Sequence, residues 1–143
     1  MKAKSGFTLV EILIVVVILG ILAAVVIPQF TEASTEAKTS SLCTDLQMMR
    51  SQIELYKIQH NDDLPAEGVD TEADFIADMT SQTNVAGAAG TDYGPYMQKI
   101  PTNQFNDQED IDVDGTLGDG SHGWHFDTTT GQFHADTAAH SGL

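Results

Sequence analysis

The stretch GFTLVE at residues 6–11, followed by the apolar run at residues 12–27, decides the fold of this chain. After the glycine, Thr8 and Glu11 are the only polar residues in it. A helix needs about 20 apolar residues to cross a bilayer core, so this segment is long enough to span a membrane. An acidic residue at the centre of a span costs roughly 2.5 to 3.5 kcal/mol, which predicts that Glu11 lies near one end or meets a partner there.

The short leader before this stretch is basic, since it contains Lys2 and Lys4. By the positive-inside rule these lysines stay in the cytoplasm, so we expect a single span with the rest of the chain outside. A cleavable signal peptide fits less well, because its apolar core has roughly 7 to 15 residues and ends at the cleavage site. Here the apolar run continues beyond the small residues Ala23 and Ala24.

The composition leaves room for one small domain beyond the span. The chain has 143 residues, with 6 basic and 21 acidic side chains and a formal net charge of −15 at pH 7. From Asp62 onward Lys99 is the only basic residue, so nucleic acid would be repelled and this end should face water or bind cations. The single cysteine, Cys43, excludes a disulfide within the chain, and we expect it to pack as a small apolar side chain.

A second helical pattern follows the span, at residues 29–60. Its apolar side chains recur at three- and four-residue steps and predict one buried helical face: Leu42, Leu46, Met49, Ile53 and Tyr56. Pro28 lacks a backbone donor, and we expect it to bend or loosen the helix rather than end it. The turn formers and proline at residues 61–65 end the helix.

The remaining segments predict a small α+β domain. Thr71 to Asp74 forms a capping box for a short helix that buries Phe75, Ile76 and Met79. We expect Tyr93 and Tyr96 to clamp their loop onto the core. Residues 123–127 and 132–136 alternate as two strands around a turn. The predicted fold is therefore a long N-terminal helix packed against a small C-terminal antiparallel sheet.

An acidic loop precedes these strands and has the composition of a cation site. Asp110, Asp112, Asp114 and Gly115 match the first half of an EF-hand loop, and Asp119 follows. The second half fails, because Ser121 stands where the motif needs a bidentate glutamate. The four aspartates predict a calcium site of another type, and the alternative is a solvated acidic loop. The three nearby histidines, His122, His125 and His134, we expect on the hairpin surface rather than around zinc.

The N-terminal stretch resembles the processing site of type IV prepilins and of the pseudopilins of type II secretion. The resemblance implies that a prepilin peptidase cuts after Gly6 and methylates Phe7. It also implies that Glu11 meets the N-terminal amine of a neighbouring subunit in the assembled filament. The expected division is a leader at residues 1–6, a span and filament-core helix at 7–27, and an external domain at 28–143.

Three classes of function are compatible with a membrane-anchored chain. A filament subunit accounts for the leader, Glu11, the helix and the small domain together. An anchored enzyme accounts only for the span, since the sequence pairs no nucleophile with a base. An anchored calcium- or ligand-binding module leaves the processing motif as coincidence. We predict a filament subunit and no enzyme.

Within the filament class, the missing disulfide favours a secretion pseudopilin over a pilin for adhesion, motility or DNA uptake. The resemblance to major pseudopilins also implies calcium in the C-terminal loop. It further implies partners: related minor pilins in the filament, prepilin peptidase, an inner-membrane assembly platform, and a cytoplasmic motor ATPase that acts indirectly. The expected path leads from the inner membrane to a periplasmic or extracellular filament.

Overall fold

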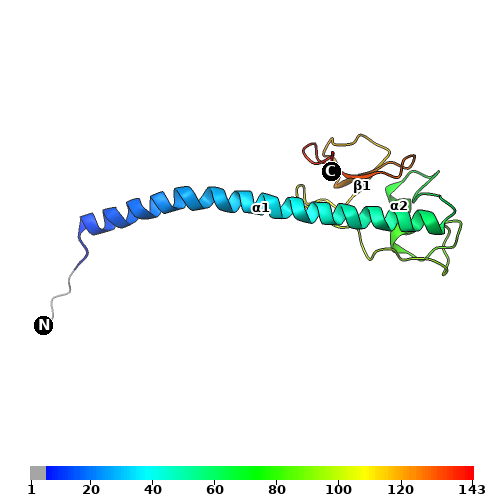
Figure 1. Ribbon diagram of the computed structural model, residues 1–143, viewed down its shortest axis with the longest axis horizontal. Helices are drawn as coiled ribbons and strands as arrows, with labels where there is room; N and C mark the ends of the chain where they lie inside the picture. The colour runs from blue at the N-terminus through cyan, green and yellow to red at the C-terminus, as the bar shows by residue number, and fades with distance from the viewer. Residues whose placement is uncertain (1–5) are drawn as a thin grey trace. The chain divides into compact units, whose positions relative to one another are not determined.

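A computed structural model describes residues 6–143 of the chain (Figure 1). Most of the predicted leader at residues 1–6 therefore lies outside the described residues. The chain divides into two compact units, Met1–Ala37 and Lys38–Leu143, which are considered separately below. Helix α1, Leu9–Gln59, contributes to both units.

The part of α1 in the first unit is apolar and uncovered. It contains a membrane-length window of mean hydropathy 3.3, none of which is buried. Its large apolar side chains are all exposed, from 42% of the surface of Val26 to 82% of that of Leu9. The helix continues through Pro28, as predicted, although proline cannot donate the usual backbone hydrogen bond.

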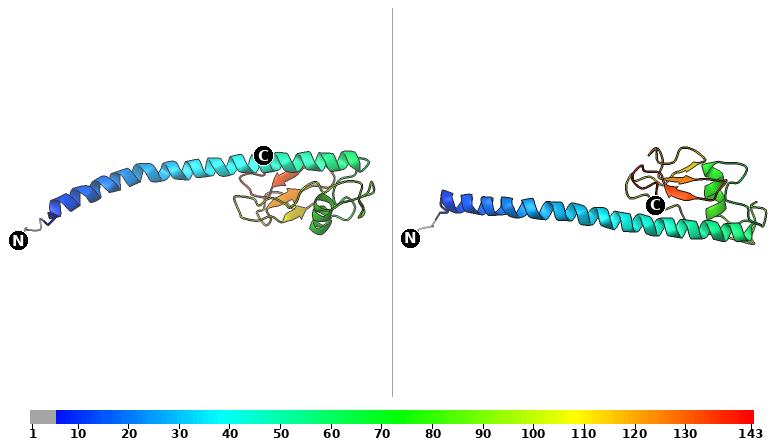
Figure 2. Two further views of the ribbon diagram at one scale, coloured as in Figure 1. Left: turned by 90° about the horizontal axis from the view of Figure 1, so that it is seen from below. Right: turned by 45° about the horizontal axis from the view of Figure 1, so that its top comes forward.

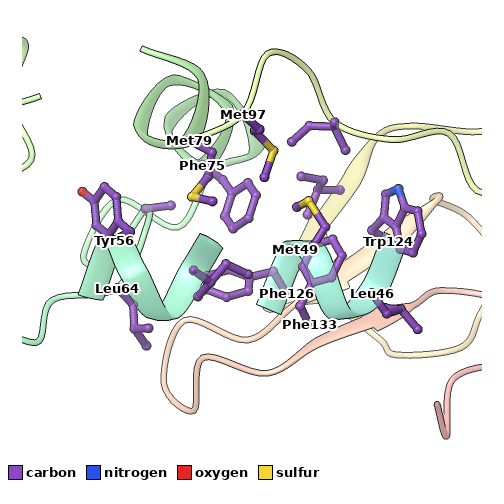
Figure 3. Close-up of a cluster of buried hydrophobic side chains, with 14 of the residues drawn as sticks. Leu46, Met49, Tyr56, Leu64, Phe75, Met79, Met97, Trp124, Phe126 and Phe133 are labelled. Carbon is purple, nitrogen blue, oxygen red and sulfur yellow. The ribbon is translucent and has the colours of Figure 1, made fainter. Parts of the chain in front are cut away.

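The second unit is built on the apolar face of α1 that the sequence predicts to be buried, here called the stripe. All five stripe residues are buried, from Leu42 to Tyr56. Helix α2, Glu72–Thr80, begins at the predicted cap, where the Thr71 hydroxyl accepts a hydrogen bond from the Asp74 N–H. Phe75 and Met79 of α2 join the stripe in one apolar cluster, together with side chains of the sheet (Figure 3).

The sheet has three short strands in the order β1-β2-β3, namely β1 Ile111–Val113, β2 Trp124–Phe126 and β3 Phe133–Ala135 (Figure 2). Strands β2 and β3 form the predicted antiparallel hairpin. Strand β1 runs parallel to β2, so the sheet is mixed and the expectation of a purely antiparallel sheet was wrong in this respect. The loop between β1 and β2 returns the chain to the end of the sheet at which β1 starts. Strand β2 therefore runs in the same direction as β1.

Both outer edges of the sheet bond to charged side chains. On β1, the N–H of Ile111 donates to Oε1 of Glu72 at 3.1 Å. On β3, Nε of Arg50 donates to the carbonyl oxygen of Phe133 at 3.0 Å. Nη2 of Arg50 also donates to the carbonyl oxygen of Leu143 at 2.7 Å. Arg50 therefore ties α1 both to the edge strand and to the last residue of the chain.

The aromatic loop is anchored at the C-terminal end of α1, as predicted. The Tyr96 hydroxyl donates to Oε1 of Gln59 at 2.7 Å. The buried His60 ring stacks on Tyr56 with ring centres 3.8 Å apart. Its Nε2 lies 2.9 Å from the Thr83 hydroxyl, which connects the helix end to the following loop. Cys43 is a free, half-buried thiol.

Candidate functional site

The first candidate site is the start of α1, where Thr8 and Glu11 form a reciprocal cap. Oε2 of Glu11 accepts hydrogen bonds from the Thr8 N–H at 2.7 Å and from the Thr8 hydroxyl at 2.9 Å. The Thr8 hydroxyl in turn accepts the Glu11 N–H at 3.3 Å. This is the capping-box arrangement, in which threonine at the N-cap and glutamate three residues later satisfy unpaired donors of the first turn. Glu11 thus has a partner within its own chain before any neighbour binds.

The predicted processing residues precede this cap directly. Gly6 and Phe7 are exposed and lie outside the helix, which begins at Leu9. An ideal Cβ at Gly6 would meet nothing within 4 Å. Cleavage after Gly6 would create an amine at Phe7, one residue before the Thr8 N–H that already bonds to Glu11. The described residues therefore leave the peptide bond after Gly6 accessible.

The second candidate site is the acidic loop between β1 and β2, and its four aspartates point to different groups. Asp110 accepts the Gly123 N–H at 3.0 Å, and the Asp112 carboxylate lies against Gly115. Their partners are therefore on separate segments.

The two exposed aspartates of this loop bond to neighbouring hydroxyl groups. Asp114 accepts the Thr128 N–H at 2.8 Å and its hydroxyl at 2.5 Å. Asp119 accepts the Ser121 hydroxyl at 2.6 Å and the Ser121 N–H at 2.8 Å. These hydrogen bonds lower the pKa of Asp119 below its ordinary value. Each of these two carboxylates therefore already has a local partner.

A fifth carboxylate, Asp136, lies beneath the loop and bonds to its backbone. It is fully buried, and its two oxygens accept the Gly118 N–H at 2.6 Å and the His122 N–H at 3.1 Å. Hydrogen bonds of this kind offset the cost of burying a polar group. Asp136 therefore holds both ends of the segment that contains Asp119.

The four predicted ligands do not fit one calcium ion as the structure places them. Among residues 6–143, no three histidine, cysteine, aspartate or glutamate side chains are grouped to hold a metal ion. Calcium takes 6 to 8 oxygen ligands, so Asp114 and Asp119 would first have to leave Thr128 and Ser121. Calcium binding stays a prediction from the sequence.

Comparison with known proteins shows the family to which this chain belongs. A family model described as the prokaryotic N-terminal methylation motif matches residues 1–27. The type II secretion system core protein G of Pseudomonas aeruginosa is 31% identical over 117 residues, which cover 82% of this chain and 79% of the relative. The chain belongs to the type II secretion system core protein G family.

Other relatives of this core protein G family member show how far each resemblance extends. The core protein G of Klebsiella pneumoniae is 28% identical over 86% of this chain and 81% of its own length. A fimbrial protein of Pseudomonas aeruginosa is 39% identical, but over 54 residues that cover 38% of this chain and 35% of the relative. Both core protein G relatives thus match over more than four fifths of this chain, whereas the fimbrial relative matches over 38% of it. No solved structure matches the chain.

Two residues of these sites, Thr8 and Asp136, were not predicted from the sequence. Thr8 was detectable, because the spacing Thr8-x-x-Glu11 is itself a capping-box signature. Asp136 had no such signal, since its partners Gly118 and His122 are distant in sequence and only the folded loop brings them to it.

Proposed function

We propose that this chain is a structural subunit of the pilus-like filament of a type II secretion system. The observation that carries the proposal is a single carboxylate, Glu11, within a processing motif at the start of an exposed apolar helical segment. Family membership supports it.

The exposed apolar side chains of α1 must be shielded from water, and the proposed function shields them at each stage. Burial of apolar surface contributes roughly 25 cal/mol per Å², so a helix with every large side chain exposed is unstable in water. Before assembly the bilayer covers this segment, and after assembly neighbouring helices do. The subunit is held in the inner membrane and then moves into a filament without exposing the segment to water.

Glu11 sets the position at which a subunit docks when it moves into the filament. In the filament, the amine of Phe7 on a neighbouring subunit pairs with the Glu11 carboxylate. A buried charge without its partner is strongly destabilising, so a misplaced subunit is rejected. The Thr8 hydrogen bonds reduce the cost of the charge while the subunit waits in the membrane.

The partners and location follow from this cycle. Prepilin peptidase cuts after Gly6, and related pseudopilins join the filament. The leader with Lys2 and Lys4 stays cytoplasmic, and the unit Lys38–Leu143 lies on the outer side. Energy comes from a separate motor ATPase acting through an assembly platform, because the sequence contains no phosphate-binding loop. The role is mechanical and not catalytic.

A pilin for adhesion, motility or DNA uptake is the second candidate. The fimbrial relative supports it, but that similarity covers only 38% of the chain. Deleting the gene would distinguish the two functions, since loss of secreted proteins from the medium indicates secretion and loss of surface motility or transformation indicates a pilus.

The assembly role is tested with Glu11→Val in cells that have the prepilin peptidase and the secretion machinery. Removing a charge from the span should leave insertion and processing intact. Filament yield should fall strongly, because the neighbouring amine loses its counter-charge. Immunoblots of membrane and sheared filament fractions measure both quantities.

The matched control is Glu32→Val, which removes an exposed glutamate of α1 beyond the apolar segment. It should assemble normally. A normal filament yield from Glu11→Val would exclude the proposed role of Glu11.

A further inference from the structure

Two apolar side chains are exposed near the C-terminal end of α1. Ile58 is 73% exposed, the largest value for a bulky apolar side chain in the unit Lys38–Leu143, and Leu55 is 40% exposed. Ile58 lies on the side of α1 opposite the stripe, because the two-residue step from the buried Tyr56 turns the helix by about 200°. Leu55 and Ile58 are here called the helix patch.

A groove with an apolar floor lies beside α2 in the same unit and has a volume of about 340 Å³. Its apolar side chains are Ile76 and Ile100. Ile100 is 6% exposed and belongs to the apolar cluster of the domain, and Ile76 packs against that cluster. Sites of about 300 to 1,000 Å³ hold small molecules, so this groove can hold a few side chains but not a whole helix.

The helix patch and the groove cannot meet within one chain. The stripe of α1 packs into the same cluster as Ile76 and Ile100, and the helix patch points away from that cluster. Only the groove of another copy can therefore receive the patch. A contact between two different surfaces of identical chains gives an open filament unless its rotation closes a ring. An open filament is the assembly that the proposed function requires.

Basic side chains are scarce in this chain, and two of them lie at these surfaces. Besides the leader lysines, the chain has four basic residues. Lys38 lies over the Phe105 ring, with Nζ 6.0 Å from the ring centre, and Arg50 bonds to two carbonyl oxygens. The other two are Lys57, which adjoins the helix patch in the last turn of α1, and Lys99, which lines the groove. Each surface thus carries a cation in an otherwise acidic domain.

We propose that the helix patch of one copy docks into the groove of the next copy in the filament. This inference rests on the proposed function and adds to it a contact between the external domains. Docking removes Leu55 and Ile58 from water against Ile76 and Ile100. Packing of the apolar helical segments holds the two copies together, so the effective concentration is high and a small contact is sufficient.

The charges around the two surfaces are complementary in this arrangement. Two copies with a formal net charge of −15 repel one another unless opposite charges meet at their contact. Lys57 of one copy faces a groove that is lined by the carboxylates of Glu109 and Asp110. Lys99 of the other copy faces the exposed Asp62, which follows α1. Charges at the rim of a contact mainly set its orientation, so these pairs select one docking geometry.

The test places one cysteine on each surface, with the native thiol removed by Cys43→Ala. The pair is Ile58→Cys and Gln98→Cys, since Gln98 is exposed and lines the groove. The chain is produced in cells that have the prepilin peptidase and the secretion machinery, and an oxidant is added to sheared filaments. A disulfide needs Cβ atoms about 3.5 to 4.5 Å apart. The paired variant should give a ladder of dimers, trimers and longer products on non-reducing gels, because each copy joins two neighbours.

Three controls accompany this variant. Each single cysteine should stay monomeric, which excludes contacts between like surfaces. Leu117→Cys is the matched replacement for Gln98→Cys, since Leu117 is 41% exposed but belongs to the acidic loop and does not line the groove. Together with Ile58→Cys it should give no ladder.

Ile58→Asp tests the contact without any cysteine. Filament yield should fall by about tenfold or more, because the apolar contact is lost and a charge enters the groove. Ile58→Leu keeps an apolar side chain and should assemble normally. Ile58 is exposed, so Ile58→Asp leaves the apolar core of the domain intact. This pair of variants decides the question even if the cysteine variants do not assemble.

The outcomes separate this contact from the proposed function. Filaments of the paired variant that give no ladder, or a normal filament yield from Ile58→Asp, would overturn the docking contact and leave the proposed function standing. A cross-link from Ile58→Cys to a protein of another mass would also overturn it, because the neighbour would not be a second copy. An absence of filaments from the unmodified chain in the same cells would overturn the proposed function and the contact together.

Discussion

Thr8 donates two hydrogen bonds to a single oxygen of Glu11, one from its main-chain N–H at 2.7 Å and one from its hydroxyl at 2.9 Å. Both bonds use Oε2, so Oε1 can accept from another donor, such as the amine of a neighbouring subunit. The carboxylate proposed to direct assembly is thus held in place by its own chain. The first turn of α1 is ordered by the same contact.

Removing the Thr8 hydroxyl should loosen the first turn of α1. Loss of an N-cap side chain typically costs about 1 kcal/mol. In Thr8→Val, hydrogen exchange of the amides near Glu11 in micelles should therefore be about fivefold faster. Thr8→Ser keeps a hydroxyl and should retain slow exchange. Thr31→Val removes a hydroxyl that bonds within the helix at Ile27, so the first turn should be unaffected. Unchanged exchange in Thr8→Val would show that the hydroxyl is not needed.

Cleavage should fall between Gly6 and Phe7. We expect the protein purified from membranes of cells with a prepilin peptidase to begin at Phe7 and to carry one added methyl group. Intact-mass analysis and N-terminal sequencing measure both features, and a strain without the peptidase is the control. A mature start near Val25 would instead indicate an ordinary signal peptide.

The calcium prediction is testable through stability. A bound ion should raise the free energy of unfolding by roughly 2.7 kcal/mol at a hundred times the dissociation constant. Because Asp114 and Asp119 must first leave their present partners, we expect this only near millimolar calcium, the range of about 10⁻⁴ to 10⁻³ M found in extracellular modules.

Melting curves of the full chain in micelles with calcium or magnesium would measure this effect. Magnesium should act poorly, since it retains its waters. Asp112→Ala combined with Asp114→Ala should abolish the calcium response. Equal shifts from the two ions would identify the loop as a solvated acidic surface.

His134 should make the domain less stable as the pH falls. Burial lowers its folded pKa below the ordinary value of 6.5, so between these two values the unfolded chain binds more protons. Stability is therefore lost as the pH falls through 6.5 towards the folded pKa. In His134→Gln this part of the slope should disappear from urea unfolding curves. Thr129→Ala on the same hairpin should keep the parental slope, and an equally steep slope in His134→Gln would contradict the assignment.

Local patterns predicted much of this fold. The spacing of Leu42, Leu46 and Met49 identified the buried face of α1, because helix periodicity requires only neighbouring residues. The cap at Thr71 and the hairpin at residues 123–136 were likewise encoded locally. Glu11 could also be identified from its neighbours, because it is the single charged residue in an apolar run.

Contacts between distant segments were not predictable in this way. Strand β1 was missed because Ile111 and Val113 alternate with aspartates and were interpreted as part of a ligand loop. Its parallel pairing with β2 depends on the path of the intervening chain. The burial of Asp136 and of His125 depends on the same loop.

The charged partners on the sheet edges bear on how this chain avoids a wrong polymer. Exposed strand edges are templates for amyloid-type aggregation, and a protein crowded in a membrane before assembly meets many copies of itself. Glu72 occupies the outward N–H of Ile111, and Arg50 occupies the outward carbonyl of Phe133. Each bond blocks an edge position that another copy would need for strand addition. The two bonds therefore hinder strand addition at both edges of the sheet and leave the exposed helical segment as the open surface for assembly.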